Sequence, residues 1–222
     1  MKRTKLFDWL FTHRHPIFLV GLLTFFILPE VFEKIFHITF SFKFFIAILI
    51  ISSMLLIHAS PGKRFLSYAL VASLIIFLFI WNRSRESSDL DQTGFAVLFI
   101  YFSFISFFLF RDLMQNKKIT GSVIIGAFAG YFMIGVIYFF IFAFLDNAYP
   151  DTISVDLQRY RGLEDMFYFS FITLTTIGYG DFAPTSILGQ KIAILEGLIG
   201  QFYIAIVMAI LVGKFLSRDQ KD

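Results

Sequence analysis

The sequence predicts an all-α membrane protein in which six helices cross the bilayer and one shorter apolar segment enters it without crossing. Two observations support this fold class. Of the 222 residues, 58% are hydrophobic and only 16% are charged, and the mean hydropathy is +0.77, whereas a soluble domain averages about 25% charged residues. The apolar residues also gather into runs close to the roughly 20 residues that a helix needs to cross a membrane.

The composition also excludes several other classes of protein. A chain this apolar is neither disordered nor a nucleic-acid-binding protein with a basic tail. It contains no cysteine, so we expect no disulfide framework, no thiolate metal site and no cysteine nucleophile. The sequence has no paired carboxylates, no nucleophile with a neighbouring base, and no plausible ligand cluster among His13, His15, His37 and His58. We therefore expect neither an enzyme nor a cofactor.

Six apolar runs follow one another along the chain. The first extends from Ile17 to Leu28 and continues to Phe36 across a Pro-Glu pair, so we expect a short first span or one with an interfacial end. The last, from Ile187 to Gly213, is interrupted only by Lys191 and Glu196. The four runs between them are Phe44 to Gly62, Phe65 to Asn82, Gln92 to Phe110 and Ile119 to Leu145.

A seventh apolar stretch, Met166 to Gly180, is too short to cross the membrane and ends in a glycine-rich tail. Irregular backbone is tolerated at membrane depth only where protein buries it or where it lines a water-filled cavity. We therefore predict a re-entrant segment, in which a half-helix enters the membrane and an extended chain leaves it again. Glu164-Asp165, at the start of the half-helix, suit the positive end of a helix dipole.

The basic residues predict how the spans are oriented. With an even number of spans, both termini lie on one side, and that side would hold twelve of the 19 Lys and Arg residues. The twelve are Lys2, Arg3, Lys5, Arg14, Lys63, Arg64, Arg111, Lys117, Lys118, Lys214, Arg218 and Lys221. The other seven are Lys34, Lys43, Arg83, Arg85, Arg159, Arg161 and Lys191. The positive-inside rule then predicts cytoplasmic termini in a plasma or bacterial inner membrane, with the re-entrant segment open to the outside.

The re-entrant segment ends in Thr175-Thr176-Ile177-Gly178-Tyr179-Gly180-Asp181. This motif resembles the selectivity filter of potassium channels, in which rings of backbone carbonyls replace the water shell of the ion. The carbonyls of an extended chain normally point alternately to opposite sides. Gly178 and Gly180 allow a positive φ without steric cost, which lets successive carbonyls face one side. A lone Gly-x-Gly would be a tight turn between two helices, but seven matching residues between two spans favour a filter.

The resemblance implies a site and an assembly. Backbone carbonyls would hold the ion, the Thr176 hydroxyl would be its innermost ligand, and Tyr179 would point away from the pore and brace the filter. The ion-binding residues are Thr176, Ile177, Gly178, Tyr179 and Gly180. The K+ sites are assigned to Thr176, Ile177, Gly178 and Tyr179. The residues expected to support the filter are Thr175, Asp181 and Glu196. One chain supplies one filter segment, whereas an ion on the pore axis needs a ring of oxygens, so three further copies of the chain are expected. The other expected partners are K+ and membrane lipid.

The sixth span resembles the inner, pore-lining helix of potassium channels, especially small bacterial ones. Gly200 stands where that family often has a hinge glycine, and bending there would widen the cytoplasmic mouth of the pore. Alternatively, Gly197 and Gly200 only allow close packing against the half-helix, and the sequence does not decide between the two. In the fifth span, Gly126, Gly130 and Gly135 are predicted to form a packing face against the sixth span.

Glu196 is a carboxyl group within the sixth span, which makes it a functional candidate. One interpretation places it behind the filter, protonated and hydrogen-bonded to the half-helix or to Gln201. The other places it near the outer surface, solvated and close to Lys191. We favour a structural role over a proton relay.

More weakly, the chain resembles the six-span architecture of voltage-gated-like cation channels, in which four peripheral helices precede two pore helices. A voltage sensor needs several Arg or Lys residues within its fourth span, and Thr93 to Phe110 contains none. We therefore expect gating that is not steeply voltage-dependent. The predicted layout is a cytoplasmic tail over 1–16, a peripheral four-helix domain over 17–112, a pore domain over 119–213 and a short cytoplasmic tail over 214–222.

The sequence thus predicts passive, potassium-selective conduction through a homotetrameric pore. A weakly selective cation channel is an alternative in the same class, although the intact Gly178-Tyr179-Gly180 argues against it. A non-conducting membrane subunit that modulates another channel is an alternative in a different class. Such a subunit would show no flux on its own.

Overall fold

The computed structural model of the chain describes residues 9, 12–36, 42–57, 71, 74–75, 92–115, 120–149, 152–154 and 162–219. The chain divides into two compact units. The first draws on residues 1–89, 108–116 and 120–129, and the second on residues 90–107, 117–119 and 130–222.

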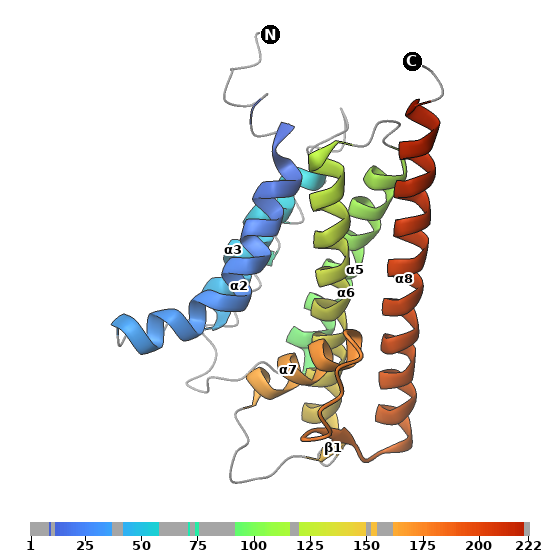
Figure 1. The fold of residues 1–222 in the computed structure, drawn as a ribbon. Helices are drawn as coiled ribbons and strands as arrows, with labels where there is room; N and C mark the ends of the chain where they lie inside the picture. Colours follow the sequence, from blue (N-terminus) through green and yellow to red (C-terminus); the bar gives the residue numbers. More distant parts are fainter. Residues whose placement is uncertain are drawn as a thin grey trace. The chain divides into compact units, whose positions relative to one another are not determined.

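Helices make up almost all of the described chain (Figure 1). They are α2 (Arg14–Phe36), α3 (Phe42–Ile57), α5 (Gln92–Gln115), α6 (Gly121–Ala148), α7 (Leu163–Leu174) and α8 (Ile187–Asp219). Two strands of two residues each, β1 (Ile153–Ser154) and β2 (Ala183–Pro184), pair antiparallel. The predicted all-helical class is therefore confirmed, and the short β pair is an addition that the sequence did not indicate.

Three of the described helices are long and apolar enough to cross a membrane, namely α6, residues 94–115 of α5 and residues 187–207 of α8. They correspond to the predicted fourth, fifth and sixth spans. The first apolar run lies in α2, which continues unbroken through Pro29, and residues 44–57 of the second run lie in α3, whereas residues 58–62 lie outside the described residues. The third run, 65–82, lies outside the described residues except for Val71, Leu74 and Ile75. The total of six spans therefore stays a prediction.

In the first unit, α2 and α3 pack against each other. They approach each other closely at Gly21 of α2, where a Cβ atom would overlap the Ser52 side chain of α3. The Ser52 hydroxyl donates to the carbonyl of Leu49 in its own helix (2.8 Å), so its burial leaves no unpaired donor. The buried side chains of these two helices include Phe18, Leu22, Phe25, Ile46, Leu49 and Ile50.

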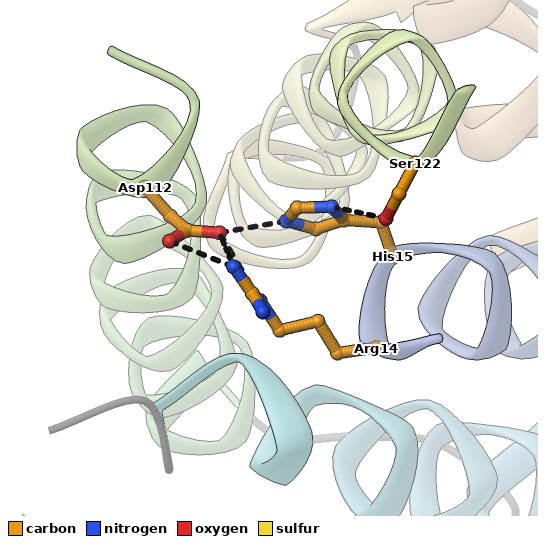
Figure 2. A network of polar contacts seen from close by, with 4 residues as sticks. All are labelled: Arg14, His15, Asp112 and Ser122. Carbon is orange, nitrogen blue, oxygen red and sulfur yellow. Dashed lines mark hydrogen bonds and ion pairs between the residues drawn. The ribbon is translucent and has the colours of Figure 1, made fainter. Parts of the chain in front are cut away.

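A polar cluster joins three helix ends in the first unit (Figure 2). The Arg14 guanidinium donates to both carboxylate oxygens of Asp112 at 2.8–3.2 Å. His15 is only 1% exposed, its Nε2 lies 2.8 Å from Asp112 Oδ2, and its Nδ1 lies 3.0 Å from Ser122 Oγ. Asp112 is in the last turn of α5 and Ser122 is in the first turn of α6. Both ring nitrogens of a buried histidine are therefore paired.

The small residues of α6 face different partners. A Cβ atom at Gly126 would lie 3.0 Å from His15, which comes from α2. Gly130 lies against the Tyr203 side chain of α8. The predicted packing face against the sixth span is therefore correct at Gly130 and wrong at Gly126. It is also wrong at Gly135, which faces α7, because a missing side chain permits a close approach without specifying which helix makes it.

In the second unit, aromatic rings pack α7 against α6. The ring pairs are Phe132–Phe171, Phe139–Phe167 and Phe142–Phe169, whose centroids lie 4.8–5.5 Å apart. Such pairs contribute about 0.5–1.5 kcal/mol each beyond the area that they bury. A Cβ atom at Gly135 would lie 2.7 Å from the Phe171 ring, so the missing side chain makes room for it. These phenylalanine side chains of α6 and α7 thus pack against each other.

The chain around α7 follows the path that the sequence predicts for a re-entrant segment. With 12 residues, α7 is about 18 Å long, too short for a hydrocarbon core of about 30 Å. Its last residue, Leu174, lies against Gly200, which is about 20 Å along α8 from the first residue of that helix. The chain then returns without helix to β2, which pairs with β1 shortly after α6 ends. A short helix followed by a non-helical return is therefore confirmed.

The polar cluster predicts different roles for two nearby histidines. His15→Ala should lower the stability of the folded chain by about 2 kcal/mol, because it removes the contacts of His15 with Asp112 and Ser122 and leaves a cavity at a buried position. His13→Ala is the matched control, since His13 hydrogen-bonds only in an exposed position, and it should change stability by less than about 0.5 kcal/mol. Apparent melting temperatures in detergent measure both effects. Equal shifts for the two variants would contradict a stabilising role for the cluster.

Candidate functional site

The site begins at the C-terminal end of α7. Glu164 and Asp165 lie in the first turn of this helix, where negative charge interacts favourably with the helix dipole. The last turn closes at Thr175, whose N–H donates to the Phe171 carbonyl (3.0 Å) and whose hydroxyl donates to the same oxygen (2.6 Å). The negative end of the α7 dipole therefore lies where the filter motif starts.

The backbone of the filter motif alternates in handedness. Thr176, Gly178 and Gly180 have φ values of 58°, 52° and 80°, whereas Ile177 and Tyr179 between them do not have a positive φ. The positive φ predicted for the two glycines is confirmed. The positive φ of Thr176 was not predicted, and it is unusual for a β-branched residue. This alternation reverses every second peptide, which is the geometry that lets successive carbonyls face one side.

Hydrogen bonds tie the start of the motif to its helix. The N–H groups of Ile177 and Gly178 both donate to the Ile172 carbonyl, at 2.9 and 3.2 Å. The Tyr131 hydroxyl of α6 donates to the Leu174 carbonyl at 3.0 Å. These contacts satisfy carbonyls that the end of α7 would otherwise leave unpaired. They also hold the motif in register with α6 and α7, and the sequence did not single out Tyr131.

Beyond this point the motif is unpaired and open. Within the described part of the chain, the carbonyls of residues 176–180 accept no hydrogen bond. The side chains of Ile177 and Tyr179 are 53% and 71% exposed. The bracing role expected of Tyr179 therefore stays a prediction. A row of backbone oxygens is available to an outside partner.

The outer end of the motif is held by a contact between two side chains. The Tyr168 hydroxyl of α7 donates to Asp181 Oδ2 at 2.8 Å, and Asp181 Oδ1 accepts the N–H of Phe182 at 3.2 Å. The hydrogen bond from Tyr168 to Asp181 is the main cause that raises the pKa of the Tyr168 phenol above its ordinary value. The sequence selected Asp181 as a supporting residue but missed Tyr168. Its partner lies 13 residues away, and the motif alone does not reveal it.

Behind α7 lies the carboxyl group of Glu196, which is fully buried. Its Oε1 lies 2.6 Å from the hydroxyl of Ser170 on α7, and that hydroxyl also lies 2.9 Å from the carbonyl oxygen of Gly135 on α6. Its Oε2 has no hydrogen-bond partner in the described chain. Of the surroundings that the sequence left open, the contact with the half-helix is the one observed. Lys191 and Gln201 are both exposed.

The two glycines of α8 near this level differ in their surroundings. A Cβ atom at Gly200 would lie 2.7 Å from Leu174 Cδ1 and 3.0 Å from the Leu174 carbonyl oxygen, so a side chain there would collide with the end of α7. A Cβ atom at Gly197 would meet nothing within 4 Å. Close packing against the half-helix is therefore a property of Gly200 and not of Gly197. The hinge role of Gly200 stays a prediction.

The chain resembles known channels over this region. Residues 121–217 match the family model described as Ion channel (Ion_trans_2). Over 86 residues, the chain is 28% identical to potassium voltage-gated channel subfamily A member 10 of Gallus gallus and to member 2 of Oncorhynchus mykiss, covering 37% of this chain and 17% of each relative. Over 99 residues, it is 26% identical to a voltage-gated potassium channel regulatory subunit of Rattus norvegicus, covering 44% of this chain and 19% of the relative. The alignments thus span less than a fifth of these relatives. No solved structure matches the chain significantly.

The family match covers α6, α7, the filter motif and most of α8, which are the elements that build the site. The match covers less than half of the chain, so it shows what residues 121–217 are similar to. The named relatives that share this region are subunits of voltage-gated potassium channels. Residues 121–217 are therefore similar to the pore domain of ion channels, with distant homology to voltage-gated potassium channel subunits over the pore region.

Proposed function

We propose that four copies of this chain surround one axis and conduct K+ passively and selectively across the membrane. The observation that carries this proposal is the run of carbonyls at residues 176–180, which accept no hydrogen bond from the described part of the chain, with positive φ at every second residue. The carbonyls of Thr176, Ile177, Gly178 and Tyr179, with the Thr176 hydroxyl, would replace the water shell of the ion. Gly180 would complete the filter at its outer end.

Exposure in the isolated chain supports an assembly. Only 11% of the apolar window of α8 is buried, against 56% of the window in α6. The filter motif next to it is exposed along its whole length. A single filter strand offers oxygens from one side only, and an ion on an axis needs them from all sides. Three further copies would supply the other strands and would cover Tyr179.

The electrostatics of the half-helix favour a cation. The C-terminal end of α7 carries the negative end of its dipole to the inner end of the filter. Half-helices aim their ends at ions in the same way in other transport proteins. Asp181 adds a carboxyl group at the outer end. A pore built from four such segments would attract cations and disfavour anions.

The peripheral part of the chain argues against steep voltage gating. The apolar segment of α5 between Thr93 and Phe110 contains no Lys or Arg, and Arg111 follows it near the end of the helix. Helices that carry no charge through the membrane field gain little energy from a change of the membrane potential, so the potential would have little effect on their position. The proposed layout keeps the peripheral helices within 17–112, the pore within 119–213, and cytoplasmic tails at 1–16 and 214–222. The membrane would be a plasma or bacterial inner membrane.

A second candidate function has one observation in its favour. A relative over the pore region carries the name of a voltage-gated potassium channel regulatory subunit. A non-conducting subunit that modulates another channel would keep the same pore domain and enter mixed assemblies. Purified alone it would pass no ions, whereas co-expression with a conducting channel would change that channel's current. The first experiment below separates the two functions.

Purified protein in liposomes should pass K+ at least about tenfold faster than Na+, which corresponds to about 1.4 kcal/mol between the two barriers. The reason is that rigidly spaced carbonyls match one dehydrated ion better than another. Flux of each cation under a matched gradient measures the ratio, and empty liposomes give the background. Equal rates for K+ and Na+ would support a weakly selective channel, and background rates for both would support a modulatory subunit.

Gly178→Ala should abolish K+ flux while the tetramer survives. No atom lies within 4 Å of the Cβ that it adds, but φ is +52° at this position, which costs a non-glycine residue about 1–2 kcal/mol in each chain. Four copies multiply this cost, so we expect at least about a 100-fold loss of flux. Gly121→Ala is the matched control, because Gly121 has neither a positive φ nor a neighbour within 4 Å. Retention of flux in Gly178→Ala would mean that ions take another path.

Single-channel recordings in planar bilayers should show an open probability that changes little over about 100 mV on either side of zero. The physical reason is the absence of basic residues between positions 93 and 110. Introducing Arg residues there would not be expected to create a sensor without matching partners. A steep rise of open probability, equivalent to several charges per chain, would show that charges elsewhere in the chain act as the sensor.

A further inference from the structure

The hydroxyl of Ser170 lies within hydrogen-bond distance of two oxygen atoms on two other helices. One is the backbone carbonyl of Gly135 on α6 at 2.9 Å, and the other is Glu196 Oε1 on α8 at 2.6 Å. A serine hydroxyl has one proton to donate and two lone pairs to accept with. A backbone carbonyl can only accept. Both contacts can therefore be hydrogen bonds only if Ser170 donates to Gly135 and accepts a proton from Glu196.

The ionised alternative leaves two polar groups unsatisfied. A carboxylate at Glu196 would take the only Ser170 proton, and Ser170 would then face the Gly135 carbonyl without a hydrogen between them. The other carboxylate oxygen, Oε2, is buried without a partner in the described chain, so it would hold charge in an apolar surrounding. A neutral carboxylic acid leaves only an uncharged carbonyl oxygen there, which is far less costly than a charge.

Among the described residues, the groups around Glu196 offer no compensating cation. Tyr131 and Tyr138 of α6 face it closely enough to interact electrostatically, and both are neutral at physiological pH. From α7 it meets Ser170, which does not titrate. On its own helix, Lys191 is exposed, and no ion pair to Glu196 occurs among the residues that the structure describes.

We propose that Glu196 is a protonated carboxylic acid that donates to Ser170 and thereby acts as a positioning residue for the selectivity filter. The chain of hydrogen bonds runs from Glu196 of α8 through Ser170 of α7 to the carbonyl of Gly135 in α6. Ser170 precedes Leu174, the last residue of α7, by about one helical turn. The consequence for conduction rests on the proposed potassium channel, whereas the protonation state does not.

Infrared difference spectroscopy on the full chain in lipid at neutral pH tests the protonation state directly. The wild type should show the carbonyl stretch of a protonated carboxylic acid, and Glu196→Gln should lack it. Ser170→Ala should shift the band because the acceptor of the acid proton is gone. Glu164→Gln is the matched control, since Glu164 is exposed in the first turn of α7, and it should keep the band. A wild type without a band that Glu196→Gln removes would overturn the proposal, whether or not the chain conducts.

K+ flux in liposomes tests the positioning role. A glutamine amide can still donate to Ser170, so Glu196→Gln should pass roughly five- to tenfold more K+ than Glu196→Ala. Raising the pH should reduce flux in the wild type and leave the Glu196→Gln flux level. Equal losses in the two variants, or a wild type indifferent to alkaline pH, would contradict the positioning role. A wild type that has the band but passes no K+ at any pH would overturn the proposed function and leave the protonation of Glu196 supported.

Discussion

The constraint on which the rest of this structure depends is that backbone carbonyls in a membrane need partners. Helices satisfy them internally, and most of the described chain is helical. Among the described residues, 176–180 form a non-helical segment whose carbonyls accept no hydrogen bond, and a positive φ at every second position removes them from any regular ladder. In the proposed pore, the missing partner is a cation on a shared axis, and the other strands come from other copies. The proposed function then follows from backbone carbonyls that lack hydrogen-bond donors.

Such a segment holds its shape only if its surroundings restrict it. Backbone in a sparsely populated conformation persists where neighbouring contacts over-determine it, and Thr176 has such a conformation. Its N–H donates to the Thr173 carbonyl at 3.0 Å, and the Tyr131 hydroxyl holds the Leu174 carbonyl just before it. At the other end, Tyr168 holds Asp181. The aromatic rings that pack α7 against α6 make this frame rigid, which a filter based on spacing requires.

The local parts of this structure could be predicted from the sequence, and the long-range pairings could not. Apolar runs indicated α5, α6 and α8, and the glycines of the motif indicated where φ becomes positive. The sequence offered the half-helix as one possible partner of Glu196, but it did not indicate Ser170, because that contact depends on how α7 and α8 pack against each other. Gly126 shows the same limit, since a small residue predicts a close neighbour but not that the neighbour is His15. Two of the side chains that hold the ends of the motif, Tyr131 of α6 and Tyr168 of α7, lie outside the motif in the sequence.

The clusters around Asp112 and around Glu196 each hold a carboxyl group away from bulk water, one as part of an ion pair and the other as a neutral acid. Their positions on the helices explain the difference. Arg14 and Asp112 lie in terminal turns, and their side chains are 15% and 21% exposed. An ion pair between them therefore remains partly hydrated. Glu196 lies well inside a membrane-length helix and is fully buried, where a charge without a counter-ion is far more costly. Carrying a proton is the only way in which a carboxyl group can both donate and remain neutral at that position. A neutral donor suits the support of a cation pathway as well, because a fixed charge behind the half-helix would add its field to that of the filter.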